Sequence, residues 1–199
     1  GSAVALDAID VAAISLGRTR DDMRGHCVFT TIINTNSPLQ LDVPMAEGLI
    51  IMAEHGQCNV ITPFTLAGAM SPVTLPGALA QQHAEAMAGI VLAQIVNPGA
   101  PVMYGGFTSN VDMKSGAPAF GTPEYAQAAQ ISGQLARLLG VPFRSSNVTA
   151  ANDVDAQAAY ESMMSLWGAI TGGANLILHA AGWLNGGLTA SCEKLIIDA

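Results

Sequence analysis

The chain has 199 residues, 50% of them apolar and only 11% charged, with a formal net charge of −8. That much apolar sequence can build one sizeable hydrophobic core. The seven Lys and Arg residues are scattered, and nucleic-acid binding needs concentrated positive charge, so nucleic acid is not expected as a partner. No uninterrupted apolar run reaches the length of about 18 residues that marks a membrane span, so no membrane segment is expected.

Cysteine usage indicates free thiols rather than a zinc site or a disulfide framework. Cys27, Cys58 and Cys192 lie far apart, without a CxxC pair or a His/Cys ligand spacing. Their odd number and the lack of a signal peptide favour the reducing cytoplasm as the location. Residues 1–2 look like a cloning remnant, which leaves 3–199 as a single domain.

Helical and strand patterns alternate along the chain. Each predicted strand is a short run rich in apolar or β-branched residues, and proline, glycine or a capping residue bounds most predicted helices. In chain order we predict a helix over 3–16, a helix start at Thr19, a strand over 28–33, a helix from Pro44 to Gly56, a strand over 59–62, a helix over 76–96, a strand over 101–104, a helix from Pro123 to Gly140, a strand over 143–148, a helix over 155–170, a strand over 174–178 and a helix from Ser191.

This alternation indicates parallel strands joined by right-handed crossovers. Five such units fit either an open doubly wound sheet or part of a (β/α)8 barrel, and a closed barrel typically needs about 250 residues. We expect the strands to be adjacent in chain order, with Asn34, Pro63, Gly105, Asn147 and His179 at or just beyond their carboxyl ends. Unpaired strand edges invite association, which leaves a homo-oligomer open.

Polar and aromatic residues follow several predicted strands, where β/α enzymes place reactive groups. His179 ends the strand over 174–178, which we expect to be buried on both faces. An imidazole there could exchange protons near neutral pH, or it could be a hydrogen-bonded core residue. Tyr104 and Phe107 could belong to an aromatic box for a quaternary ammonium, although packing is the commoner role.

Acidic residues and their neighbours supply the other candidates. Asp112 lies in a long glycine-containing loop, where it could line a pocket or form a surface pair with Lys114. Asp155 could cap the helix that it opens. Gln157 and Glu161 are four residues apart and share a helix face, which could turn toward a barrel mouth or toward solvent.

Four sequence blocks resemble the trimethylamine methyltransferase family. They are GAMSPVTLPGAL (68–79), VNPGAPVMYGGFTSNVDMKSGAPAFGTPE (96–124), DAQAAYE (155–161) and NLILHAAG (175–182), and their order and spacing match the family from about Thr35 to Ala199. The family has a barrel fold and markedly longer chains. The resemblance therefore implies a partial (β/α)8 TIM-type barrel of about five parallel β/α units, an excerpt that we expect to be a poor catalyst alone.

The resemblance also implies an activity. Family members move a methyl group from a small methylated amine to the Co(I) of a corrinoid that a separate protein carries, so no tightly bound cofactor is expected in this chain. His179, from its place after a predicted strand, and Glu161, whose role the family match favours, are the candidate catalytic residues. The candidate substrate-binding residues are Tyr104, Phe107, Asp112, Asn147, Asp155 and Gln157.

The chain departs from the family pattern at one position. Trimethylamine-specific members activate the substrate with a pyrrolysine that falls near Asn152, where this chain has only ordinary residues. The resemblance then points to quaternary amines such as glycine betaine, whose amine leaving group is already neutral and needs only alignment. Two alternatives stay open. One is a non-catalytic fragment or binding module, and the other is a barrel enzyme for a small anionic metabolite, with Arg144 and Lys114 as the only candidate basic residues.

Overall fold

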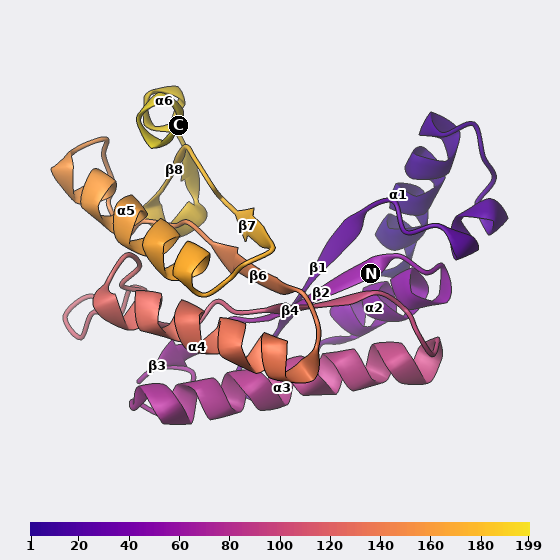
Figure 1. Ribbon diagram of the computed structural model, residues 1–199, viewed down its shortest axis with the longest axis horizontal. Coiled ribbons are helices and arrows are strands. Elements are labelled where there is room, and N and C mark those ends of the chain that lie inside the picture. Colours follow the sequence, from indigo (N-terminus) through magenta and orange to yellow (C-terminus); the bar gives the residue numbers. More distant parts are fainter.

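Five parallel strands form one sheet in the computed structural model, which describes residues 1–199 (Figure 1). Their order in the sheet is their order in the chain: β1 (Thr30–Thr35), β2 (Cys58–Pro63), β4 (Val102–Gly105), β6 (Phe143–Ser146) and β7 (Leu176–Leu178). Every neighbouring pair is parallel. The sheet curls into half of a barrel, so the predicted partial (β/α)8 barrel is confirmed. The strand order contains no switch point, which rules out the doubly wound alternative.

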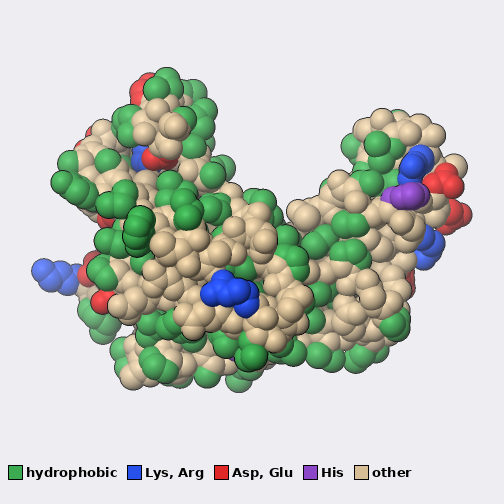
Figure 2. Space-filling model, in the orientation of Figure 1, with side chains coloured by type: hydrophobic (Ala, Val, Ile, Leu, Met, Phe, Trp, Pro, Cys, Tyr) green, Lys and Arg blue, Asp and Glu red, His purple; other side chains and the backbone are tan.

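Four helices connect successive strands of the sheet: α2 (Val43–Glu54), α3 (Leu75–Val96), α4 (Pro123–Leu139) and α5 (Ala156–Thr171). Helix α1 (Ser2–Ser15) precedes β1, and α6 (Cys192–Asp198) follows β7. The helix start expected at Thr19 corresponds to a short 3-10 helix, η1 (Asp21–Gly25). Figure 1 shows α1 and α6 at opposite ends of the molecule, and Figure 2 shows a hollow between these ends. None of the helices has the length and hydrophobicity that crossing a membrane requires.

Two pairs of short strands lie outside the main sheet, and the sequence did not predict them. β3 (Leu66–Ala67) pairs in parallel with β5 (Ser109–Asn110), just beyond the carboxyl ends of β2 and β4. β8 (Trp183–Leu184) and β9 (Thr189–Ala190) form an antiparallel pair on either side of the 3-10 turn η2 (Asn185–Gly187). Strands of two residues are too short to show a periodic pattern in the sequence.

The ends of the helices follow local chemistry. The hydroxyl of Thr122 accepts a hydrogen bond from the backbone N–H of Tyr125 at 3.3 Å and caps α4. Gly140 ends the same helix with φ of 68°, a left-handed conformation that glycine adopts without steric cost. Asp155 and Ser191 cap α5 and α6 through hydrogen bonds to the third residue beyond them.

The strands alternate between two environments, as their pleat requires. One set of side chains packs against the helices in the main hydrophobic core: Ile33, Ile61, Tyr104 and Phe143. The next residue of each strand faces the hollow side of the half-barrel: Asn34, Thr62, Gly105 and Arg144. The strand register brings this second set side by side, because Asn34 pairs with Thr62 and Gly105 pairs with Arg144.

The last strand differs from the prediction. β7 was expected to be buried on both faces, yet each of its three residues is only half-buried. It has one neighbour, β6, and it lies at the edge of the sheet. The apolar residues of β7 therefore indicated a strand but not its position in the sheet. All five residues expected at or beyond the carboxyl ends are found there: Asn34, Pro63, Gly105, Asn147 and His179.

A close contact between α4 and α5 gives a test of this packing. A Cβ on Gly133 would lie 1.9 Å from the carbonyl oxygen of Gly172, whereas a Cβ on Gly48 of α2 would find its nearest atom at 3.9 Å. We expect Gly133→Ala to lower the free energy of unfolding by about 1–3 kcal/mol through overpacking. Gly48→Ala should raise it by about 0.5–1 kcal/mol, because alanine is the better helix former. Urea unfolding of both variants measures the difference, and equal effects would contradict this packing.

Candidate active site at the carboxyl ends of the strands

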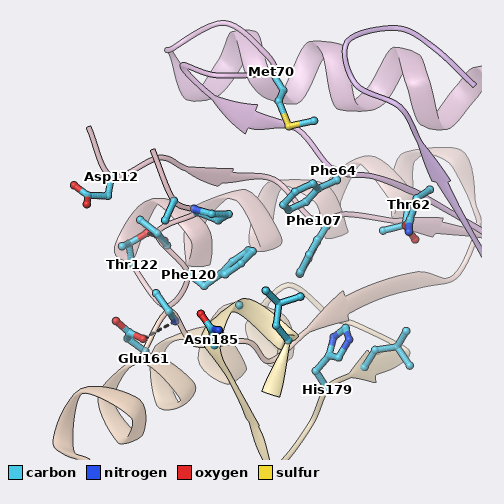
Figure 3. A pocket seen from close by; sticks show the side chains of 18 of the residues that line it. Thr62, Phe64, Met70, Phe107, Asp112, Phe120, Thr122, Glu161, His179 and Asn185 are labelled. Carbon is cyan, nitrogen blue, oxygen red and sulfur yellow. Dashed lines mark hydrogen bonds between the residues drawn. The ribbon is translucent and has the colours of Figure 1, made fainter. Parts of the chain in front are cut away.

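A cavity of about 1300 Å³ opens at the carboxyl ends of the parallel strands (Figure 3). Residues of all the main strands or of the loops that follow them reach its wall, and so does the start of α5. This is the position at which β/α barrels carry their active sites, because the loops that follow the strands meet there. The cavity is the place to look for the predicted site residues.

Three phenylalanine rings form one wall of the cavity. The Phe64 and Phe107 ring centroids are 5.2 Å apart, and those of Phe107 and Phe120 are 5.1 Å apart. Phe64 follows β2, Phe107 follows β4 and Phe120 precedes α4, so distant segments of the chain meet here (Figure 3). Aromatic ring faces attract cations, and quaternary ammonium groups are the ligands that such walls suit best. Phe107 was a predicted site residue, and the other two were not.

Arg144 is the unusual charge of the site. It lies on β6 with 3% of its surface exposed, and its Nε and Nη1 atoms are buried without a hydrogen-bond partner. Its Cζ atom is 5.5 Å from the centroid of the Phe107 ring. Burial lowers the pKa of Arg144 to about 10, which still leaves it charged at neutral pH. A buried guanidinium with free donors is suited to bind a carboxylate through two parallel hydrogen bonds.

His179 lies next to this arginine, directly after β7. Its backbone φ is 53°, a left-handed value that a residue other than glycine adopts only at a cost. The ring centroid lies 6.3 Å from that of Phe107 and 5.3 Å from that of Trp183. Burial, and then the charge of Arg144, lower the pKa of His179, so the imidazole is neutral at pH 7. Its Nδ1 atom is 3.4 Å from the Ser146 hydroxyl.

Glu161 lines the cavity, and both of its oxygens are engaged. One accepts hydrogen bonds from the backbone N–H groups of Ala150 and Ala151, at 2.8 and 3.0 Å. The other accepts from the side-chain amide of Gln157 at 2.8 Å. Glu161 therefore holds the loop after β6, and Gln157, which also reaches the cavity wall, supports it.

Asp112 lies on the rim of the cavity and is exposed. Its carboxylate accepts hydrogen bonds from the hydroxyl of Ser115 at 2.6 Å and from the backbone N–H of Lys114 at 3.1 Å. These bonds, that of Ser115 first, lower the pKa of Asp112. The expected surface pair with the Lys114 side chain does not form, so Asp112 mainly shapes its own turn.

Three predicted site residues do not line the cavity. Tyr104 faces the helices, because it alternates with Gly105 on β4, and its hydroxyl accepts from Gln82 at 3.2 Å. Asn147 is buried and donates to the carbonyl oxygen of Ala180 at 2.9 Å. Asp155 caps α5 by accepting from the backbone of Ala158 at 3.0 Å. A place near a strand end does not fix the direction of a side chain, so a binding role for these three residues stays a prediction. The alternative expected for Asp155, a helix cap, is confirmed.

Arg144 is the residue whose importance the sequence understated. It was noted only as a basic group near a strand end, and its burial and lack of a partner appear only in three dimensions. Asn152, near which the resemblance to the family places the pyrrolysine of trimethylamine-specific members, lies on the cavity wall. No group of His, Cys, Asp and Glu side chains is arranged to hold a metal ion.

Comparison with known proteins identifies the family. The family described as trimethylamine methyltransferase (MTTB) matches residues 1–199. This chain belongs to that family. A glycine betaine methyltransferase from Desulfitobacterium hafniense (strain Y51) is 43% identical over 199 residues, which is 100% of this chain and 41% of that protein.

Other members of the trimethylamine methyltransferase family are also similar. The trimethylamine methyltransferase MttB of Methanosarcina barkeri (strain Fusaro / DSM 804) is 34% identical over 95% of this chain and 38% of that protein. A proline betaine:corrinoid methyltransferase of Eubacterium limosum is 32% identical over 81% of this chain and 34% of that protein. The chain thus spans between 34% and 41% of the length of these relatives.

The two buried cations of the chain give a matched test of the site. Lys194 has no exposed surface, but its Nζ atom donates to Ser162 at 2.6 Å and forms an ion pair with Asp198. We expect Arg144→Met to raise the melting temperature, because it removes a desolvated charge that has no partner. The lowered pKa agrees in sign, since the folded state disfavours charged Arg144 at every pH below about 10.

Lys194→Met should have the opposite effect and lower stability by about 3–5 kcal/mol, because it leaves Asp198 buried and unpaired. Thermal unfolding of the two variants beside the wild type is the measurement. A loss of stability in Arg144→Met comparable with that in Lys194→Met would mean that Arg144 has a structural partner.

Proposed function

We propose that this chain forms the amine-binding site of a methyltransferase that takes its methyl group from a quaternary amine bearing a carboxylate, and passes it to the Co(I) of a corrinoid carried by a partner protein. The observation that carries the proposal is the buried, unpaired guanidinium of Arg144 beside an aromatic wall. One group suits a carboxylate and the other suits a quaternary ammonium. A betaine carries both in one small molecule.

The reaction needs positioning more than acid–base chemistry. When a methyl group leaves a quaternary nitrogen, the electron pair of the broken C–N bond stays on the nitrogen and gives a neutral tertiary amine. No proton has to be supplied to the leaving group. The site must hold the substrate so that one N-methyl carbon faces the Co(I) in line with the C–N bond. Arg144 would fix one end of the molecule, and the ring of Phe107 would hold the other end nearby.

His179 would complete the same wall. As a neutral imidazole it adds no second positive charge against the ammonium, and it can donate one hydrogen bond to the substrate carboxylate. Its place beside Phe107 and Trp183 limits its motion. In this proposal Glu161 does not contact the substrate. It acts indirectly, because one of its oxygens holds the loop that carries Ala150 and Ala151.

The proposal separates quaternary amines from trimethylamine. Trimethylamine has no carboxylate for Arg144. Transfer of one of its methyl groups would also expel dimethylamide, a strongly basic anion, unless the nitrogen were first activated. Only ordinary residues stand near Asn152, where trimethylamine-specific members use pyrrolysine. The names of two relatives, a glycine betaine methyltransferase and a proline betaine:corrinoid methyltransferase, support a betaine as the substrate class.

Ligand binding to the intact protein tests the substrate class. We expect glycine betaine to bind more tightly than choline, which has the same quaternary ammonium without the carboxylate, and trimethylamine to bind most weakly. Arg144→Met should weaken glycine betaine binding at least about 10-fold through loss of a charge-assisted pair, and should leave choline binding unchanged. Arg137→Met is the matched control, because Arg137 donates to the carbonyl oxygen of Gly172 on the outer helices.

Calorimetric titration of the three ligands into each protein gives these affinities. Equal loss of glycine betaine and choline binding in Arg144→Met would assign the arginine to structure alone. A preference of the wild type for trimethylamine, or methyl transfer from it, would contradict the proposed substrate class.

The second test concerns His179. We expect His179→Ala and His179→Asn to fold but to transfer methyl to Co(I) at least about 100-fold more slowly, because the substrate loses a group that aligns it for in-line attack. Asparagine tolerates the left-handed backbone that His179 adopts, so it separates backbone strain from loss of the imidazole. His55→Ala is the control, since the His55 ring is buried at the end of α2 and bonds the Ile51 carbonyl oxygen at 2.8 Å.

His55→Ala should lose stability and keep a near-normal rate per folded molecule. Melting temperature and transfer rate, measured on the same preparations, distinguish the two histidines. A destabilised His179→Asn with a near-normal rate would remove His179 from the site.

A further inference from the structure

A chain of buried polar side chains lies behind two rings of the aromatic wall. The hydroxyls of Thr65 and Thr108 are hydrogen-bonded to each other, and Thr108 donates to the Gln82 carbonyl oxygen at 2.6 Å. The Gln82 amide nitrogen donates to the Ser132 hydroxyl at 2.8 Å and to that of Tyr104 at 3.2 Å. All five side chains are almost completely buried. Gln82, on α3, is the only member with contacts to three others.

The sequence positions of the threonines connect this chain to the cavity. Thr65 directly follows Phe64, and Thr108 directly follows Phe107. The next residues belong to β3 and β5, which pair in parallel with Leu66 opposite Ser109. In extended chain, adjacent side chains point to opposite faces, so the threonines point toward α3 when the phenylalanines point into the cavity.

A glycine makes room for the arrangement. A Cβ on Gly106 would lie 2.9 Å from the Ser132 hydroxyl and 3.4 Å from the Gln82 carbonyl oxygen. Gly106 directly precedes Phe107, so the backbone that carries the central ring of the wall packs against this polar chain. Since buried polar groups are costly when unpaired, the hydrogen bonds fix the relative position of the two loops.

We propose that Gln82 is a positioning residue for substrate binding. Through Thr108 and Thr65 it holds the loops after β2 and β4 at the spacing that sets Phe64 and Phe107 5.2 Å apart as one surface for a quaternary ammonium. The role rests on the proposed function, in which that wall binds the cationic end of the amine. Gln82 itself does not reach the cavity, so its effect on the ligand is transmitted by the two loops.

The test compares Gln82→Met with a matched variant on the same helix. Gln94→Met removes a glutamine whose side chain bonds Ala100 at 2.8 Å and Gly99 at 2.9 Å, at the other end of α3. Gly106→Ala is a third variant that crowds the polar chain without removing any of its hydrogen-bonding groups. Three measurements on the intact protein are made for each: melting temperature, hydrogen exchange, and calorimetric affinity for tetramethylammonium and glycine betaine.

We expect Gln82→Met and Gly106→Ala to speed backbone hydrogen exchange over 64–67 and 107–110. Both variants should also bind tetramethylammonium and glycine betaine at least about fivefold more weakly, because misplaced rings lose cation–π attraction. Gln94→Met should speed exchange over 97–100 and change the affinities by less than about twofold, even at a similar loss of melting temperature. Unchanged affinity in folded Gln82→Met, or an equal loss in Gln94→Met, would overturn the role.

Failure of the proposed function would look different. If neither cation bound the wild type, the aromatic wall would not be an amine site. Backbone hydrogen exchange would then be the measurement that decides whether Gln82 holds the two loops. Exchange over 64–67 and 107–110 that stayed at the wild-type rate in Gln82→Met would then show that Gln82 does not hold the loops.

Discussion

Parallel pairing of five consecutive strands is the constraint on which the site depends. It brings the carboxyl end of every strand to one rim, and the register then fixes which side chains meet there. Arg144 faces the hollow because Phe143 before it is committed to the helix-covered core. Gly105, its pairing partner on β4, has no side chain, and a Cβ there would lie 2.2 Å from the Thr62 hydroxyl. The side chains that face the hollow are therefore packed under steric constraints as close as those in the core.

The electrostatics of the site run against the needs of a stable fold. A buried cation without an anionic partner, a histidine kept neutral beside it and a left-handed backbone at that histidine are each unfavourable in the free protein. Elsewhere the chain pairs its buried charge, as Lys194 and Asp198 do within α6. Unfavourable features gathered at one cavity are typical of sites that bind a ligand able to satisfy them.

Side chains of α3 hold the loops that follow β1, β2 and β4 by hydrogen bonds. Besides Gln82, this helix carries Glu85, whose carboxylate accepts from Thr35 at 2.5 Å, Ser37 at 2.7 Å and the backbone of Leu39 at 2.9 Å. Burial alone would raise the pKa of Glu85, but these hydrogen bonds outweigh it and lower the pKa. The loop after β1 is thus held by an anion, as the loops after β2 and β4 are held by an amide.

The sequence by itself determined the elements and their order. Apolar runs and capping residues such as Thr122 gave the five strands and their helices to within a few residues, because these depend on local propensity. It also placed Phe107, Asp112, Gln157, Glu161 and His179 at what proved to be the cavity. What only the tertiary structure decided was direction and partnership. Tyr104 turned to the core, Glu161 became a loop anchor, and Arg144 became an unpaired charge, because burial and hydrogen bonding depend on residues distant in the chain.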